Sequence, residues 1–346
     1  MNARTLRFFV PFAISAALLY FIIRSVAAEP GQVIATFFAA DWRLIAPAIA
    51  LYFVGIWLRS ARWGLLLPEH MVKTSTLFRA LVVGFTVNNL LPLRIGEVAR
   101  TYLLNRWCRI PYGATIASLV VERVLDGLSL AMLLLVALTV VPAPGYLRWA
   151  GGVAALGFLS GAALLALGAW RTSAITAIAG FVARLLPERF GAIVERLAAS
   201  FARALVLVHD PTRLTRVLGL SLLAWCFELG LFFVLLIAFG LPGSYPLALL
   251  VGSAGNFATL IPSSPGYAGT FDAAVIAVLQ SPEVGIPAVQ ATAYDFAVHM
   301  TLLVPVTIVG ALVLWRSHVT FGQLTHASAP VSSELSSPPA AIGTRP

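Results

Sequence analysis

The chain of 346 residues is 60% apolar and only 11% charged, with a mean hydropathy of +0.92. Soluble domains carry about 25% charged residues, so this composition excludes a water-exposed globule and favours an all-α polytopic membrane protein. The net charge of +9 comes from arginines clustered beside apolar stretches, a pattern that sets membrane topology and attracts anionic lipid, so no nucleic-acid partner is expected.

Six apolar stretches are about long enough to cross a bilayer, which takes roughly 20 residues per helix. We expect these spans near 8–27, 44–65, 115–141, 146–170, 217–240 and 289–315. The first follows basic residues as a signal peptide would, but its apolar run is too long for a cleaved one, so a retained helix is predicted.

The remaining polar segments are expected at the cytoplasmic face. Residues 171–216 are rich in arginine and predict an amphipathic segment, whereas 317–346, rich in Ser and Pro, predict a disordered tail. With the N-terminus inside, nineteen of the 23 Lys and Arg residues fall on the inner side and three on the outer side. This bias predicts that both termini are cytoplasmic.

Only two cysteines are present, Cys108 and Cys226. Neither a disulfide framework nor a zinc site is therefore predicted, and no metal or cofactor is expected.

Two further apolar regions are interrupted and do not fit as ordinary spans. Residues 74–110 hold an apolar run, then Asn88 and Asn89, then a break at Pro92 and Gly96. Exposed backbone is tolerated at membrane depth only where protein or water satisfies it. The segment is therefore predicted to enter from the cytoplasm, return, and border a cavity.

Residues 246–285 repeat this order from the outer side. Here Asn256 precedes a break that contains Pro262 and Pro265, and a second apolar run follows from Phe271. The two breaks share an Asn, a Pro, a Gly four residues after the Pro, and then an acid. Opposed re-entrant elements are typical of inverted-repeat transporters with a site at the midplane; chance is the alternative, because Pro and Gly are common in membrane helices.

Three motifs in order carry a family resemblance: NNLLPLRIGE, then VERVLD, then PSSPGYAGT. Together they resemble the lysylphosphatidylglycerol synthase transmembrane-region family, also called flippase-like membrane proteins, over roughly residues 5–316. The resemblance implies one membrane domain, 1–316, that moves lipids or lipid-linked groups between the leaflets of a bacterial inner membrane. Its implied partners are an anionic phospholipid, a hopanoid or a polyprenyl-linked lipid, with a lipid-biosynthesis enzyme as a further candidate.

Bifunctional relatives carry a soluble aminoacyl-transferase domain after the membrane part, whereas only the polar tail follows the last span here. A transporter rather than an enzyme is therefore expected, without ATP hydrolysis, since no Gly-Lys-Ser/Thr loop is present. A polytopic glycosyl- or acyl-transferase and a non-catalytic subunit that recruits lipid-modifying enzymes remain the alternatives.

Candidate headgroup ligands surround the first break. Arg94 and Arg100 offer planar guanidinium donors that suit a lipid phosphate, or they anchor the tip among headgroups. Glu97 lies between them, and Asn88 and Asn89 either cap broken helix ends or line the path.

A candidate ion network begins the third span. Glu122 and Asp126 share a helix face, and Arg123 can pair with Asp126 three residues on. Glu228, an isolated acid in the fifth span, is expected to pair with Arg123. Ionisable groups inside a membrane face a cavity or a partner, so this network is either functional or a structural brace.

The second break offers a half-helix and an acid. Gly266, Gly269 and Thr270 allow a tight turn before a helix whose N-terminus either faces an anion or is satisfied by Asp272 in its first turn. In the last span, Asp295 and His299 lie four apart on one face and are expected to form a proton relay or a structural hydrogen bond.

Overall fold

The structure is a computed structural model that describes residues 13–20, 22–24, 29–67, 72–91, 95–185, 191, 194–195, 198–199, 210–261, 263–317, 319 and 322–323. Five helices in this part of the chain are long and apolar enough to cross a membrane. They are α3 (Ile45–Leu66), entered through the short helix η1 (Trp42–Leu44), α6 (Tyr112–Val140), α7 (Gly145–Trp170), α10 (Pro211–Ala238) and α13 (Ala288–Arg316). The all-α polytopic fold is confirmed, and these helices match the second to sixth expected spans.

Of the first expected span, 8–27, the structure describes residues 13–20 and 22–24, which form parts of a helix between Ala13 and Arg24. A short helix that was not predicted, α2 (Pro30–Ala39), follows it with a proline in its first turn. The expected tail, 317–346, also falls almost wholly outside the described part.

The arginine-rich segment 171–216 was predicted too long at its C-terminal end. Its described part begins with α8 (Thr172–Arg184), whereas α10 already begins at Pro211 rather than near 217. The Asp210 side chain accepts the backbone N–H of Arg213 at 3.0 Å, and Pro211 occupies the first helical turn. An N-cap followed by proline starts a helix even where arginines make the sequence look polar.

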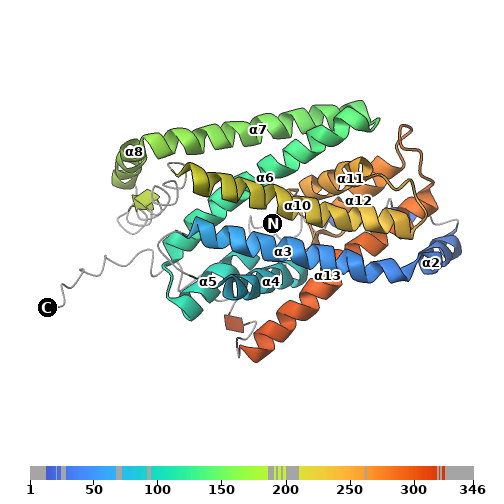
Figure 1. Ribbon diagram of the computed structural model, residues 1–346, viewed down its shortest axis with the longest axis horizontal. Coiled ribbons are helices and arrows are strands. Elements are labelled where there is room, and N and C mark those ends of the chain that lie inside the picture. Colours follow the sequence, from blue (N-terminus) through green and yellow to red (C-terminus); the bar gives the residue numbers. More distant parts are fainter. Residues whose placement is uncertain are drawn as a thin grey trace.

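Both interrupted regions form pairs of short helices. The first pair is α4 (Thr74–Leu90) and α5 (Gly96–Cys108); the second is α11 (Tyr245–Ala258) and α12 (Thr270–Leu279), joined through the short helix η3 (Pro265–Tyr267). The helices within each pair pack against each other, and each is shorter than the roughly 20 residues that a crossing needs. Figure 1 shows the two pairs toward opposite ends of the bundle, as opposed re-entrant segments require.

The order long helix, broken pair, long helix occurs twice, as α3 to α6 and as α10 to α13. Helix α3 packs along α10, α4 of the first unit packs on α13 of the second, and α11 of the second packs on α6 of the first. In the described part of the chain, three long helices, α3, α6 and α7, precede α10, and this odd number of crossings places the second unit in the opposite orientation. Figure 1 shows α3 and α10 running in opposite directions, which is the arrangement of an inverted repeat.

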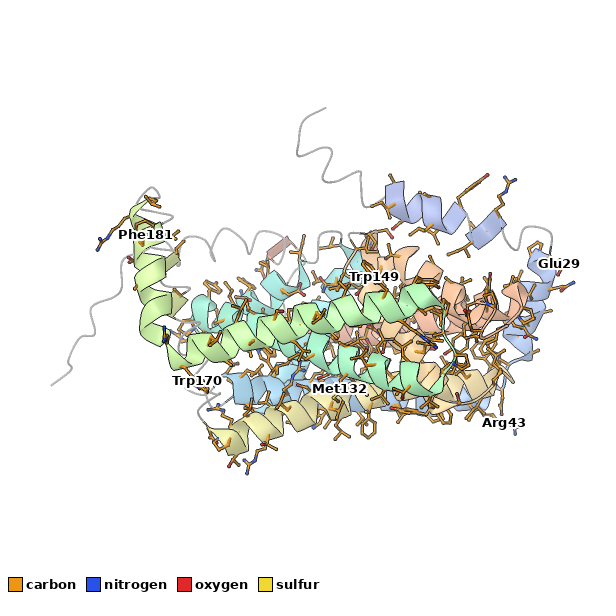
Figure 2. All side chains as sticks on the ribbon, turned by 90° about the horizontal axis from the view of Figure 1, so that it is seen from above. Glu29, Arg43, Met132, Trp149, Trp170 and Phe181 are labelled. Carbon is orange, nitrogen blue, oxygen red and sulfur yellow. The ribbon has the colours of Figure 1, made fainter. Side chains whose placement is uncertain are left out.

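The outer surface of α7 and α8 is apolar. Figure 2 shows Trp149 and Trp170 toward opposite ends of α7 and Phe181 on α8, which turns away from the bundle. These three side chains are largely exposed. Lipid rather than water suits such a face, with tryptophans near the two interfaces.

Candidate functional site

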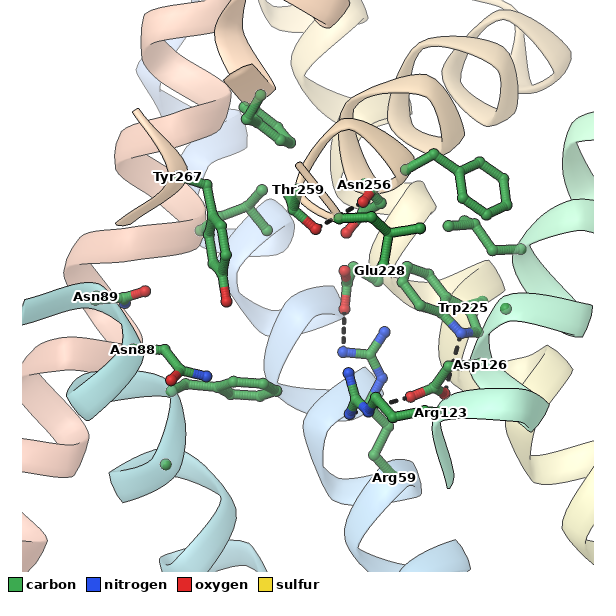
Figure 3. Close-up of a pocket in the computed structure, with 18 of the residues that line it drawn as sticks. Arg59, Asn88, Asn89, Arg123, Asp126, Trp225, Glu228, Asn256, Thr259 and Tyr267 are labelled. Atoms are coloured by element: carbon green, nitrogen blue, oxygen red, sulfur yellow. Dashed lines mark hydrogen bonds and ion pairs between the residues drawn. The ribbon is translucent and has the colours of Figure 1, made fainter. Parts of the chain in front are cut away.

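A cavity of about 420 Å³ lies inside the bundle, between the two broken pairs. Asn88 and Asn89 of α4 lie on one side of it and Asp126 of α6 lies on the other (Figure 3). Asn256 and Thr259, at the end of α11, line it from the second broken pair. A chain with apolar outer faces therefore surrounds a partly open space lined in part by charged and amide side chains, and such polar groups inside a membrane protein make this space the candidate functional site.

Arg62 of α3 forms the most buried link of the ion network beside this cavity. One of its guanidinium nitrogens lies 2.6 Å from an oxygen of Asp126 and 3.0 Å from the Ser221 hydroxyl of α10. Its side chain is 0% exposed. Side chains of three helices, α3, α6 and α10, therefore meet at the Arg62 guanidinium group.

Arg100 of α5 holds Glu122 of α6 through two N–O contacts of 2.9 Å each. Its guanidinium stacks on the Trp63 ring at 4.1 Å from the ring centre. Arg100 also lines the cavity, and its Nε has no hydrogen-bond partner among the described residues, so its expected role as a phosphate ligand stays a prediction. Arg94, Pro92 and Pro262 lie outside the described residues.

Glu228 of α10 pairs with Arg59 of α3 at 2.7 Å, and Arg59 also stacks on Trp225 at 4.3 Å. The expected pair of Glu228 with Arg123 was therefore wrong. Arg59 and Arg62 are two of the nineteen bases that the sequence assigns to the cytoplasmic side. They lie inside instead, and the apolar residues that continue to Leu67 are the signal that was available in the sequence.

Arg123 has the most exposed side chain of the four arginines in the ion network. It contacts Glu122 at 2.7 Å and Asp126 at 3.4 Å, yet its side chain is 51% exposed and lines the cavity. The side chains of Arg59, Arg62 and Arg100 are 10%, 0% and 3% exposed. Of these four, Arg123 can meet an anion in the cavity without first leaving a buried position.

The first break is held by Asn88. Its side-chain oxygen accepts the N–H of Gly96 at 2.8 Å, so it caps α5, while Asn89 donates to Thr307 of α13 at 2.9 Å. A Cβ added to Gly96 would overlap the carbonyl of Gly84, so the two helices approach too closely for a side chain. Glu97 lines the cavity, and one of its buried oxygens has no hydrogen-bond partner among the described residues.

The second break contains three residues with positive φ. Gly266, Tyr267 and Gly269 have φ values of 68°, 63° and 92°, which glycine adopts readily and tyrosine rarely. Asp272 accepts the N–H of Gly269 at 2.6 Å and so caps α12, which begins at Thr270. Asp272 therefore satisfies the N-terminus of α12, which is the second of the two roles expected for this segment.

His299 pairs with Asp272 of α12 rather than with Asp295 on its own helix. Its other ring nitrogen lies 2.9 Å from the carbonyl oxygen of Gly266. The prediction that His299 pairs directly with Asp295 was therefore wrong, because the carboxylate partner of His299 is Asp272. Asp295 instead forms a hydrogen bond with Asp272, so all three groups share one cluster.

Fold and site together define a polytopic membrane protein in which two opposed broken helices border a charged cavity. The sequence matches the family model described as the lysylphosphatidylglycerol synthase TM region over residues 8–310, and the chain belongs to this family. The resemblance identified from the three motifs is thereby confirmed.

Two known proteins are similar to this chain. The chain is 30% identical over 319 residues to Glycosyltransferase AglD of Haloferax volcanii, a match that covers 82% of this chain and 50% of that protein. It is 24% identical over 272 residues to a UPF0104 membrane protein of Methanothermobacter thermautotrophicus, covering 75% of this chain and 79% of the relative. The chain thus spans half the length of the first relative and most of the second.

Proposed function

We propose that this protein moves a polar lipid headgroup across the membrane through the central cavity, while the acyl tails stay in the bilayer. The observation that supports the proposal is the position of the cavity between two broken helix pairs of opposite orientation. Transporters built from inverted repeats place their substrate between such elements and expose it to each side in turn.

The headgroup that suits this cavity carries an anionic group such as phosphate. Arg123 presents a half-exposed guanidinium, whose planar donors bind phosphate oxygens in pairs. Asn88 and Asn89 face it across the cavity with amides that serve sugar or glycerol hydroxyls as donors or acceptors (Figure 3). The substrate class is therefore an anionic phospholipid or a polyprenyl-linked lipid.

The test is reconstitution of purified protein into liposomes that contain a trace of headgroup-labelled fluorescent lipid. A membrane-impermeant reductant bleaches only the outer leaflet, so movement between leaflets appears as additional loss of fluorescence. Liposomes with the protein should lose the inner-leaflet signal, whereas protein-free liposomes and liposomes with an unrelated polytopic protein should keep it. An inner-leaflet signal that persists with both phospholipid and polyprenyl-phosphate probes would refute the proposal.

A second candidate function is the transfer of sugar to a lipid, because a relative named as a glycosyltransferase matches 82% of this chain. The network argues for transport over transfer, since Glu122, Asp126 and Glu228 are each held by an arginine rather than free to act as a base. Purified protein incubated with sugar nucleotides and polyprenyl phosphate decides between them. A glycosylated lipid in the mass spectrum would establish the enzyme.

A further inference from the structure

A cluster of three buried titratable groups lies where the second break meets α13. It consists of Asp272 on α12 and of Asp295 and His299 on α13. His299 also lines the central cavity, so the cluster connects the cavity wall with the break. The ion network around Arg62 does not include any of the three.

The hydrogen bonds fix how many protons the cluster holds. The nitrogen Nε2 of His299 faces the carbonyl oxygen of Gly266, which only accepts, so Nε2 carries a hydrogen. The nitrogen Nδ1 faces a carboxylate oxygen of Asp272, and this contact needs one proton on either atom. The hydrogen bond between Asp272 and Asp295 needs another, because two carboxylates facing each other would repel. Two shared protons therefore make the cluster neutral.

The same bonds hold the break in its shape. His299 fixes the carbonyl of Gly266, a residue with φ of 68°, and Asp272 fixes the N–H of Gly269, with φ of 92°. Between them Tyr267 adopts a left-handed conformation that costs free energy and persists only while its surroundings enforce it. Loss of the proton between Asp272 and Asp295 would leave two carboxylates facing each other, and their repulsion would weaken the hold of Asp272 on the Gly269 N–H and on His299.

Among the residues that the structure describes, few other polar or aromatic groups face the cluster. Tyr294 of α13 lies beside Asp295 but donates its hydroxyl to the Phe232 carbonyl of α10, and the Phe271 ring of α12 packs at 5.3 Å from the His299 ring. From the N-terminal helix, Ser15 contacts the break through the N–H of Ser264.

Three further elements contribute to the surroundings of the cluster. Asn89 of α4 is bonded to α13, and across the cavity Arg59 of α3 and Glu228 of α10 neutralise each other. Proton binding is thus set mainly by the three members themselves.

We propose that Asp272, Asp295 and His299 form a proton-binding site that couples lipid movement to the proton gradient, by holding the second break closed only while both protons are bound. The inference rests on the proposed transport of lipid. One proton leaves the cluster toward one side of the membrane and is replaced from the other side in each cycle. Only O–H and N–H bonds change, so no further reactant is needed.

The test uses proteoliposomes with an imposed pH gradient, a pH dye in the lumen and the headgroup-labelled lipid. If one proton moves with each lipid, a gradient of one pH unit should shift the distribution of labelled lipid between leaflets about tenfold, since one unit is a factor of ten in proton activity. Lumenal pH should change in parallel. With Asp295→Asn, which removes the exchangeable proton, the distribution should no longer respond to the gradient. Asp41→Asn makes the same change at an exposed acid and should respond as wild type does.

A direct measurement keeps the proton site testable apart from transport. Wild-type protein should show the infrared band of a buried protonated carboxyl group, and Asp295→Asn should lose it while Asp41→Asn keeps it. Lipid movement without any response to the gradient would overturn the coupling and leave the proposed function intact. Absence of lipid movement in wild type would overturn both, and a missing carboxyl band would overturn the proton site itself.

Discussion

The Asp126 carboxylate on α6 is held by Arg62 on α3 at 2.6 Å, and the Arg62 side chain has no exposed surface. The two residues are 64 positions apart in the chain. Their pair joins the first long helix of the first unit to its last, directly beside the cavity. A buried ion pair needs both of its partners, because a single buried charge without a partner lowers the free energy of unfolding.

Replacement of Arg62 by Ala should therefore destabilise the protein. Removal of one partner of a buried pair costs about 3–5 kcal/mol, a large part of the stability of a typical domain. The folded fraction in mild detergent, followed by size-exclusion chromatography during heating, should fall well below that of wild type. Arg43→Ala, at an exposed arginine of η1, is the matched control and should leave the folded fraction unchanged. Equal stability of the two variants would show that the Arg62 pair does not brace the fold.

Arg123→Ala should separate transport from folding. Its side chain is 51% exposed, so its removal leaves Glu122 with Arg100 and Asp126 with Arg62. The amount of folded protein should stay near that of wild type, while lipid movement per folded molecule should fall at least tenfold. Arg123→Lys should recover part of the activity, because an ammonium group cannot reproduce paired guanidinium contacts. Full transport by Arg123→Ala would remove this residue from the substrate path.

Gly96→Ala should disrupt the first break. The added Cβ would overlap the Gly84 carbonyl, so α5 must move away from α4 and Asn88 must release its cap. Since the neighbour is backbone, it cannot yield as a flexible side chain would, and both stability and transport should fall. Gly152→Ala on α7 is the matched control, because a Cβ there meets nothing within 4 Å. Thermal midpoints of the two variants provide the comparison, and a wild-type midpoint for Gly96→Ala would contradict the close packing.

The broken segments could be predicted because their signals are local. Asn, Pro and Gly within a few residues interrupt an apolar run wherever the chain later packs, and Asp272 lies where a first-turn acid caps a helix. A Val-Gly-x-x-x-Asn pattern that occurs at both 83–88 and 251–256 was an additional signal that the two broken segments resemble each other.

The pairings could not be predicted because each joins distant segments. Arg59 lies at the end of an apolar run, where an arginine that faces lipid headgroups and one that faces an interior acid look alike. Only the packing of α3 on α10 distinguishes them. For the same reason Glu228 was assigned to Arg123, and His299 to the nearest acid on its own helix.

Passage of the headgroup through the cavity can be tested by filling the cavity while every charged residue that lines it is kept. Thr259 lines it from α11, and Thr259→Trp would occupy the space between the two broken pairs (Figure 3). Leu223→Trp, at a partly exposed position of α10 that lies outside the cavity lining, is the matched control. The measurement is the rate of headgroup-labelled lipid movement per folded molecule in proteoliposomes. Thr259→Trp should lower this rate to that of protein-free liposomes, whereas Leu223→Trp should retain the wild-type rate. Wild-type movement by Thr259→Trp would contradict passage of the headgroup through the cavity.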